Sequence, residues 1–220
     1  MRPFSQACEN NKAPILEVLT QYFAQVKRVF EIGSGTGQHA VYFSQQLPHL
    51  FWQTSDQSHH HAGINLWIDR VGTENVGRPK EFDVLEPGHW EDLKKDSLPA
   101  FDGVFSANTA HIMPWQGVLE MLRGIGHQLE IGGCFVLYGP FNRDGSYTSQ
   151  SNARFDQSLR EQRPHMGIRN DVDIFRVARE NKLVLVDDVG MPANNRSLVF
   201  KKKGIERTGK LRSMQKPVIY

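Results

Sequence analysis

Short apolar runs alternate along this chain with longer stretches of helical periodicity, and this alternation restricts the fold to a few classes. Seven short runs predict β-strands, at residues 28–32, 51–55, 79–83, 103–107, 134–138, 183–189 and 197–202. Between the first five runs, the pattern predicts helices over residues 37–46, 63–71, 90–94 and 115–129. Strands that alternate with helices are typical of an α/β protein with helices on both faces of a parallel sheet.

The last two predicted strands are joined by residues 190–195, and this connection is too short to contain a crossover helix. They should therefore pair antiparallel, giving a seven-stranded mixed sheet. Gly132 and Gly133 are expected to end the helix at 115–129. We expect one domain over residues 1–203, with residues 1–14 and the turn-rich segment 139–166 placed to cover the sheet's carboxyl edge, and a basic tail at 204–220.

Composition narrows the class of protein further. With 39% hydrophobic and 23% charged residues, the chain has the balance of a globular protein. Its formal charge of +2 is unevenly spread, because residues 201–220 hold seven basic residues and one acidic residue, a net +6, which leaves −4 for the first 200. Any attraction for polyanions is expected only in this C-terminal stretch, so neither a nucleic acid nor a membrane is favoured as a partner.

Cysteine usage and the N-terminal sequence point to a cellular compartment. Cys8 and Cys134 have no spacing that would build a disulfide framework or a zinc site, which fits a reducing environment. The first residues lack the apolar segment of a signal peptide, and no stretch is long and apolar enough to span a bilayer. A cytoplasmic protein is expected.

A glycine-rich turn follows the first predicted strand directly. The run from Glu31 to Gly37 reads Glu-Ile-Gly-Ser-Gly-Thr-Gly and leads straight into a predicted helix. Glycines at such a turn allow the backbone to bend tightly and a ligand to approach it. The run is not a phosphate-binding P-loop, because Gln38 and His39 stand where Gly and Lys are required, and Gln38 also replaces the third glycine of the dinucleotide fingerprint.

Two further acids lie where the next strands end. Asp56 follows the second predicted strand, 19 residues beyond Gly37, and Asp83 ends the third. Carboxylates at this edge of an open sheet can accept hydrogen bonds from ribose hydroxyls. Each acid alone is more often a surface residue or a helix cap, but Asp56 and Asp83 together with Glu31 indicate a crevice for a nucleoside-type ligand.

This arrangement resembles the class I S-adenosylmethionine-dependent methyltransferases, and more closely the methyltransferase-like 26 family. The stretches that carry the closer resemblance lie between Phe4 and Phe200: FSQACENNKAPILEVL, FEIGSGTGQHAVYFSQQLP, SANTAHIMPW, YGPFNRDGSYTSQSNARFDQSLR and MPANNRSLVF. One departure is that Asn10 stands where the family motif has an arginine. The resemblance implies a Rossmann-like methyltransferase fold that binds S-adenosylmethionine and releases S-adenosylhomocysteine.

The resemblance also implies roles for individual positions. Glu31, Gly33, Ser34, Gly35 and Gly37 would surround the methionine part of the cofactor, Asp56 its ribose, Asp83 and Val84 its adenine, and Asn108 would lie under the sulfonium.

The segment that follows the fourth predicted strand offers groups for chemistry. Asn108 could position an acceptor and His111 could take a proton from it, since an unperturbed imidazole titrates near neutrality. Alternatively, Asn108 is a turn residue and His111 hydrogen-bonds the next helix, while Trp115 is most simply a packing residue. The Asn-Pro-Pro-Tyr type of motif used on nucleic-acid amino groups is absent.

Candidate acceptor-binding residues come from two regions, Asn11 and Lys12 near the N-terminus and Tyr138, Asn142 and Arg143 after the fifth strand. Tyr147, Asn152 and the segment 191–195 are candidates of the same kind, and loop packing and turn chemistry are the alternative explanation for all of these residues. The run His59-His60-His61 is expected to be a solvated turn, and no metal site is expected.

The function favoured by the sequence is methyl transfer from S-adenosylmethionine to a small molecule or a protein side chain. An inactive cofactor-binding module of the same fold is the alternative, because fold alone does not determine function. A nicotinamide-dependent reductase is disfavoured, because the third glycine is missing and no tyrosine is followed by lysine four residues later.

Overall fold

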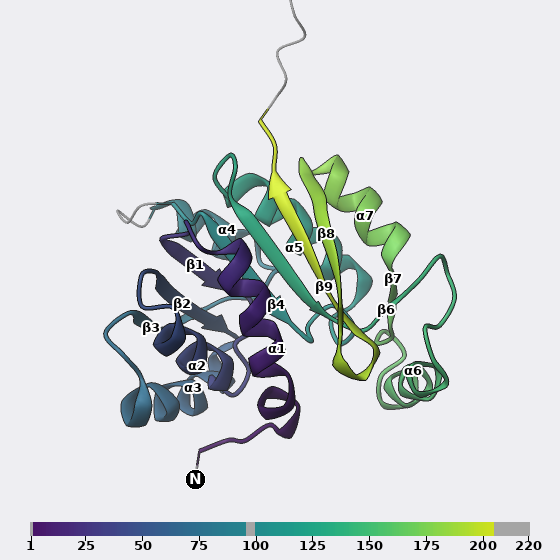
Figure 1. The fold of residues 1–220 in the computed structure, drawn as a ribbon, viewed down its shortest axis with the longest axis horizontal. Coiled ribbons are helices and arrows are strands. Elements are labelled where there is room, and N and C mark those ends of the chain that lie inside the picture. Colours follow the sequence, from purple (N-terminus) through teal and green to yellow (C-terminus); the bar gives the residue numbers. More distant parts are fainter. Residues whose placement is uncertain (1, 96–99, 205–220) are drawn as a thin grey trace, which may run out of the picture.

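The computed structural model describes residues 2–95 and 100–204. Its centre is a seven-stranded sheet in the order β3-β2-β1-β4-β5-β9-β8, in which β9 alone runs against the other strands (Figure 1). These strands are β1 (Arg28–Glu31), β2 (Phe51–Asp56), β3 (Val76–Glu81), β4 (Gly103–Ala107), β5 (Cys134–Gly139), β8 (Leu183–Met191) and β9 (Asn195–Lys202). The predicted seven-stranded mixed sheet is confirmed.

Helices cover both faces of the sheet. One face carries α1 (Gln6–Tyr22), α2 (Gln38–Gln46) and α3 (Ser58–Val71), and the other carries α4 (Pro87–Lys95), α5 (Trp115–Gln128) and α7 (Asp171–Glu180) (Figure 1). The helix α6 (Gln150–Gln162) stands at the side of the molecule, near the two short strands β6 (Phe141–Asn142) and β7 (Arg169–Asn170). A 3-10 turn, η1 (Pro192–Asn194), joins β8 to β9.

The two helical layers give the molecule two cores, one on each face of the sheet. In β5, Phe135 and Leu137 pack into the core on the α5 side, while Val136 and Tyr138 pack into the core on the α1 side. Successive side chains of a strand point to opposite faces, and all six residues of β5 are buried because both faces are covered. This burial explains why the central strands read as continuous apolar runs.

The structure places several boundaries differently from the sequence pattern. β3 begins at Val76 and ends at Glu81, so Asp83 lies beyond the strand rather than at its end. The three histidines at 59–61 lie in the first turns of α3 rather than in a loop, and His59 and His60 are exposed to solvent as expected. The helix α5 ends at Gln128, and Gly132, at φ +85°, forms the following turn into β5 instead of capping the helix.

Three helices were not predicted. α1 contains Pro14, a poor helix former, but Ser5 caps it by accepting a hydrogen bond from the Cys8 amide, and Ile15 and Leu19 are fully buried against the core. α6 and α7 lie in polar sequence; α6 buries few apolar side chains, so its periodicity is faint. Among the described residues, no helix is long and apolar enough to cross a membrane.

Candidate functional site

The strand order reverses at β1, which lies between β2 and β4. In open α/β sheets, ligands bind outside the carboxyl ends of the strands at such a switch point. The glycine loop follows β1 here, and the amides of Gly33 and Ser34 both donate to the Ser55 carbonyl of β2, at 3.1 and 2.9 Å. The loop is therefore fixed against the end of the neighbouring strand.

The three glycines of the loop have positive φ angles but different surroundings. A Cβ on Gly33 would lie 2.7 Å from the Thr109 side chain, and one on Gly37 would lie 3.0 Å from the Ile64 backbone. Gly35, at φ +56°, has no such neighbour within 4 Å. Gly33 and Gly37 are thus required by packing, whereas Gly35 faces open space into which a ligand can come close to the backbone.

Glu31 lies underneath the loop and is 2% exposed. Its carboxyl group accepts hydrogen bonds from Ser34 Oγ at 2.7 Å and from Trp52 Nε1 at 3.1 Å. Burial is the main cause that raises the pKa of Glu31 to about 7, although these two hydrogen bonds act against it. In the structure, Glu31 holds the loop through Ser34.

Asp56 and Asp83 are joined by one glutamine. Asp56 Oδ2 accepts from the Gly35 amide at 2.7 Å, and its Oδ1 accepts from the Gln57 amide at 2.8 Å. The Gln57 side chain in turn donates to Asp83 Oδ2 at 2.8 Å. The two acids and the glycine loop therefore form one continuous edge of the crevice, and each carboxylate oxygen keeps a lone pair for a ligand hydroxyl.

Val84 and the histidines complete this side of the crevice. The Val84 side chain is buried in the core, and its carbonyl accepts from Trp90 Nε1 at 2.9 Å. His60 Nε2 lies 3.9 Å from Asp56 Oδ1, and His61 Nε2 is hydrogen-bonded to the Asp56 carbonyl at 2.9 Å. Within the described parts of the chain, no three His, Cys, Asp or Glu side chains gather as metal ligands would.

Asn108 follows β4 with its backbone in the left-handed region, at φ +59°, and its amide donates to the Tyr138 carbonyl at 2.9 Å. A Cβ added to Gly139 would lie 3.8 Å from His111 Nδ1 and 4.0 Å from Asn108 Oδ1. The two candidate catalytic side chains therefore converge on the bare backbone of Gly139. A non-glycine residue at φ > 0 is uncommon, and such strain is often found at functional sites.

His111 is 6% exposed, and burial is the main cause that lowers its pKa to about 4. The Arg169 guanidinium acts in the same direction. This arginine donates to the carbonyls of Ala110 and Met113 at 2.9 and 2.6 Å, so it holds the segment that carries His111. The ring of Phe155 in α6 meets the imidazole edge to face at 5.4 Å. The imidazole is thus neutral at physiological pH.

Sequence reasoning missed Arg169, Phe155 and Gly139 as neighbours of this site. The first two lie in segments without clear periodicity, and only the fold brings them to the exit of β4. Trp115 packs against the core on the α5 side, in line with its interpretation as a packing residue.

Two of the candidate acceptor-binding residues come together in a buried polar cluster. Asn11 of α1 is hydrogen-bonded to His39 Nε2 at 2.7 Å and also contacts the Tyr138 side chain. Burial lowers the pKa of His39 to about 4 and raises that of Tyr138. Tyr138 also contacts Asn195 of β9, so the cluster joins α1, α2, β5 and β9.

The other three candidates point elsewhere. Lys12 forms an ion pair with Glu9 at 2.6 Å and lies over the Tyr42 ring, on the outer side of α2. Arg143 is exposed and pairs with Asp188 of β8 at 3.2 Å. Asn142 is buried and donates to Asn170 Oδ1 at 3.2 Å, but its own Oδ1 has no partner within the described structure. An acceptor-binding role for these residues stays a prediction.

The N-terminal segment lies directly over the helix that follows the glycine loop. Gln38, the first residue of α2, accepts from the Ser5 amide at 2.5 Å and donates to Glu9 at 3.2 Å. The side chain of Cys8 contacts Thr36 of the loop. The start of α1 is thus placed beside the crevice.

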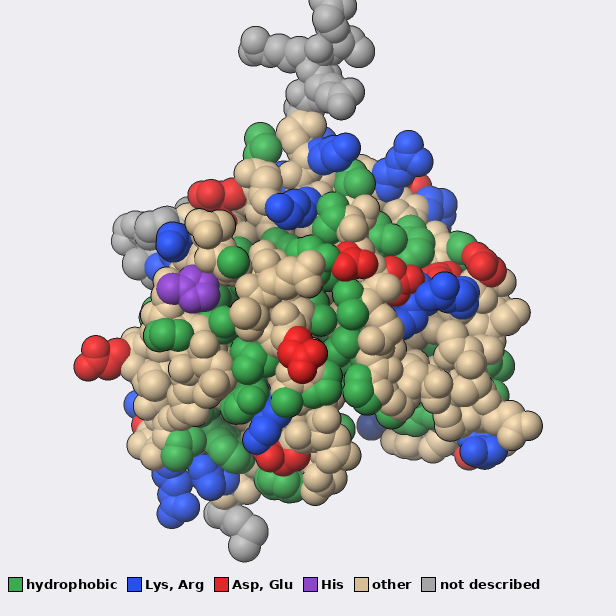
Figure 2. Space-filling model, in the orientation of Figure 1, with side chains coloured by type: hydrophobic (Ala, Val, Ile, Leu, Met, Phe, Trp, Pro, Cys, Tyr) green, Lys and Arg blue, Asp and Glu red, His purple; other side chains and the backbone are tan. Residues whose placement is uncertain are grey.

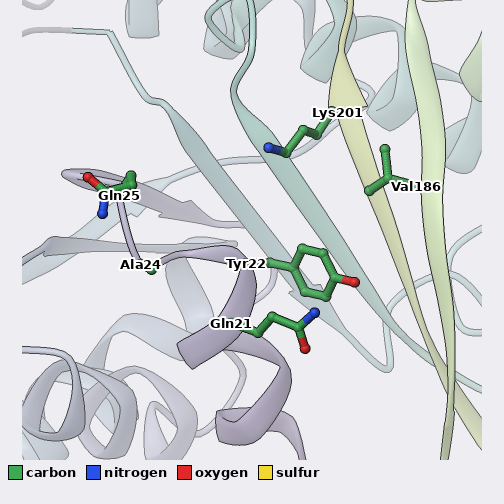
Figure 3. Close-up of a pocket in the computed structure, with 6 residues that line it drawn as sticks. All are labelled: Gln21, Tyr22, Ala24, Gln25, Val186 and Lys201. Atoms are coloured by element: carbon green, nitrogen blue, oxygen red, sulfur yellow. The ribbon is translucent and has the colours of Figure 1, made fainter.

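One cavity of about 480 Å³ lies away from this site, between the end of α1 and the strands β8 and β9 (Figure 3). Lys201, one of its lining residues, pairs in the sheet with Cys134 at the start of β5. The cavity therefore lies near the amino-terminal ends of the parallel strands, whereas the acids lie at their carboxyl ends.

The comparisons with known proteins agree with this geometry. The model of the family described as "protein of unknown function (DUF938)" matches residues 2–202. The chain belongs to this family.

Several solved structures of similar fold are methyltransferases. An O-methyltransferase family protein from Burkholderia thailandensis has a TM-score of 0.75 and 17% identity, covering 89% of this chain and 57% of its own. The S-adenosylmethionine-dependent methyltransferase SibL has a TM-score of 0.72 and 22% identity, with 90% and 56% covered. Human N-acetylserotonin methyltransferase in complex with SAM has a TM-score of 0.67 and 12% identity, with 90% and 58% covered. The chain spans just over half the length of these proteins and shares their fold.

Proposed function

We propose that this protein is an S-adenosylmethionine-dependent methyltransferase that acts on a small molecule or a protein side chain. The observation that carries the proposal is the 2.7 Å hydrogen bond from the Gly35 amide to Asp56, which places a carboxylate beside an open stretch of glycine backbone. That edge lies at the switch point of a sheet whose structural neighbours are methyltransferases.

The residues of the crevice fit a nucleoside that carries a cationic sulfur better than a phosphate ligand. Asp56 and Asp83 are acceptors only, so they suit ribose hydroxyls and an amino group, and they would repel phosphates. Gly33, Gly35 and Gly37 would lie along the methionine part, with Ser34 held by Glu31 beneath the loop. When bound, S-adenosylmethionine supplies a methyl group on a positive sulfur.

His111 and Asn108 are proposed to handle the acceptor beyond Gly139. Asn108 Oδ1 would orient a hydroxyl or amine of the acceptor, and the neutral imidazole of His111 would accept its proton. The acceptor's bond to the methyl carbon would form as the methyl–sulfur bond breaks, with the electron pair left on the sulfur of S-adenosylhomocysteine. The proton then passes from His111 to water. The ring of Phe155 covers the imidazole and helps to exclude solvent.

The proposal is tested in two steps. Calorimetry should show that the chain binds both S-adenosylmethionine and S-adenosylhomocysteine, and radiolabelled methyl groups should appear in a fraction of cell extract incubated with the enzyme. His111→Gln, which keeps a hydrogen-bonding side chain of similar length, should bind the cofactor normally and lose most of the transfer. Equal transfer by this variant would remove His111 from the mechanism.

Two other outcomes would favour the alternatives. Cofactor binding without transfer into any fraction would indicate an inactive binding module, which uses the same glycine loop. Binding of NADH without S-adenosylmethionine would indicate a nicotinamide enzyme and overturn the proposal. We also propose that the chain is related to the methyltransferase-like 26 family. The two unpaired cysteines support a further proposal, a cytoplasmic location.

A further inference from the structure

A second hollow lies outside the crevice, on the outer side of α2 and α3. It is a groove of about 970 Å³, and its lining comes from the N-terminal segment, α1, α2 and α3. We call it the α2–α3 groove. None of the candidate catalytic residues lines it, and a volume of this size is at the upper end of what small-molecule pockets occupy.

The groove exposes several large apolar side chains together. Phe4 is 61% exposed, Leu66 is 42% exposed and Val71 is 41% exposed, and Trp67 lies between them in the lining. Single exposed apolar residues are ordinary, but a contiguous set around a hollow marks an interaction site. In Figure 2, hydrophobic and basic side chains lie next to each other over α2 and α3, at the lower left of the view.

The charged residues that line the groove are mainly basic, whereas the first 200 residues of the chain have a net negative charge. Arg2, Lys12 and Arg70 line the groove, and Glu9, the acid among the lining residues, already pairs with Lys12 at 2.6 Å. Arg2 lies over the Trp67 ring at 4.0 Å, so a cation and an aromatic face are presented together. The lining residues carry a net +2, whereas the first 200 residues carry a net −4.

We propose that the α2–α3 groove docks an acidic peptide segment of a partner protein. An aliphatic or aromatic side chain of the peptide would rest on Phe4, Leu66 and Trp67, while its carboxylates meet Arg2 and Arg70. Such a complex would have an apolar contact at its centre and ion pairs around it, as protein interfaces commonly do. The proposed catalytic residues His111 and Asn108 do not line this groove, although Lys12, a candidate acceptor-binding residue, does.

Other occupants fit the groove less well. The chain's own residues 205–220 hold four basic residues and one acidic residue, so they would be repelled. Anionic membranes are recognised by clusters of about four to eight basic residues, more than the groove offers.

The test is a random peptide library displayed on phage and panned on the full chain. The selected peptides should be enriched in both Asp or Glu and Leu, Phe or Trp. One of them, synthesised with a fluorescent label, should bind the wild type in an anisotropy titration. Arg70→Glu and Leu66→Ser should each weaken that binding about tenfold or more, while both exposed positions leave the fold intact in circular dichroism.

Matched controls come from α7. Arg179→Glu reverses an exposed arginine in the last turn of a helix, as Arg70→Glu does, and Val172→Ser removes an apolar side chain that is 46% exposed. Neither should change binding. The proposal is overturned if no acidic and apolar consensus emerges, if both groove variants bind as well as the wild type, or if sedimentation shows a dimer that Leu66→Ser dissociates.

Discussion

Glu31 and Asp56 are two carboxyl groups that hold the same glycine loop in different environments. Glu31 is buried beneath the loop and bonded to Ser34 and Trp52, whereas the Asp56 side chain keeps 13% of its surface exposed and bonds the backbone of Gly35. Burial raises the pKa of Glu31, so its carboxyl group favours the protonated form, whereas Asp56 lies at the surface of the loop. Only Asp56 is therefore suited to bind ligand hydroxyls directly, and Glu31 acts on the ligand through the loop.

Replacing Asp56 with Ala should weaken the binding of S-adenosylmethionine. Two hydrogen bonds from ribose hydroxyls to a charged acceptor are lost, each worth about 1.5–3 kcal/mol, so Kd should rise about a hundredfold or more. Isothermal titration calorimetry measures the change. Asp69→Ala on α3 is the control, because Asp69 is exposed and pairs with Arg78 away from the loop. An unchanged Kd for Asp56→Ala would remove this residue from the ribose site.

Replacing Glu31 with Gln should make the protein more stable at alkaline pH. The folded-state pKa of Glu31 is raised to about 7 from 4.5, so its contribution to stability is fully present below pH 4.5 and is lost as the pH rises through 7. The neutral amide removes this dependence. Relative to the wild type, the free energy of unfolding of Glu31→Gln should gain about 2–3 kcal/mol between pH 5 and pH 8.

Urea titrations at both pH values measure the gain. The exposed Glu130→Gln serves as the control and should shift the free energy of unfolding equally at both. A parallel shift for Glu31→Gln would mean that Glu31 does not titrate in this range.

Among the helices, strands and loops, those that the sequence predicted well have a strong hydrophobic periodicity or a glycine-rich turn at their end. The strand β4 was predicted at its observed bounds, and the glycine loop was placed correctly because it joins an apolar strand to a helix. The strand β3 was displaced, since its sequence, VGRPKE, is mostly polar and half exposed at the sheet edge. The lowered pKa of His111 could not be predicted either, because it depends first on burial and then on Arg169, and both arise only in the folded chain.

The contact between α1 and α2 is expected to depend on Gln38. Its side chain accepts from the Ser5 amide and donates to the Ser5 carbonyl and to Glu9. Gln38→Ala would leave the Ser5 amide without this partner, which costs about 1–3 kcal/mol in local stability. Hydrogen exchange should then speed up at residues 5–10 while the central strands keep their protection.

Gln45→Ala is the matched control for this prediction. Gln45 lies on the same helix, is exposed and donates to the Val71 carbonyl at the end of α3. Exchange at residues 5–10 should be unchanged in this variant. If exchange there is also unchanged in Gln38→Ala, other contacts hold the start of α1 over the loop.

For the whole molecule, the near-neutral formal charge combines an acidic body with a basic end. The first 200 residues carry −4 and the last 20 carry +6. Among the described residues, the last strand of the sheet, β9, ends at Lys202, and the family match also ends at residue 202. The predicted tail, residues 204–220, lies outside the described residues apart from Gly204. The fold, the crevice and the α2–α3 groove are therefore all formed by the part of the chain that precedes it.

Ending the chain after Gly204 should leave the folded body intact. All hydrogen-bonded pairs of the sheet that lie among the described residues are kept, so the free energy of unfolding should change by less than about 0.5 kcal/mol and the Kd for S-adenosylmethionine should stay the same. The formal charge falls from +2 to −1, because residues 205–220 hold four basic residues and one acidic residue. At neutral pH the full chain should be retained on a cation exchanger and the shortened chain should not. Retention of the shortened chain would show that a basic surface of the body, such as the α2–α3 groove, is strong enough to bind the resin by itself.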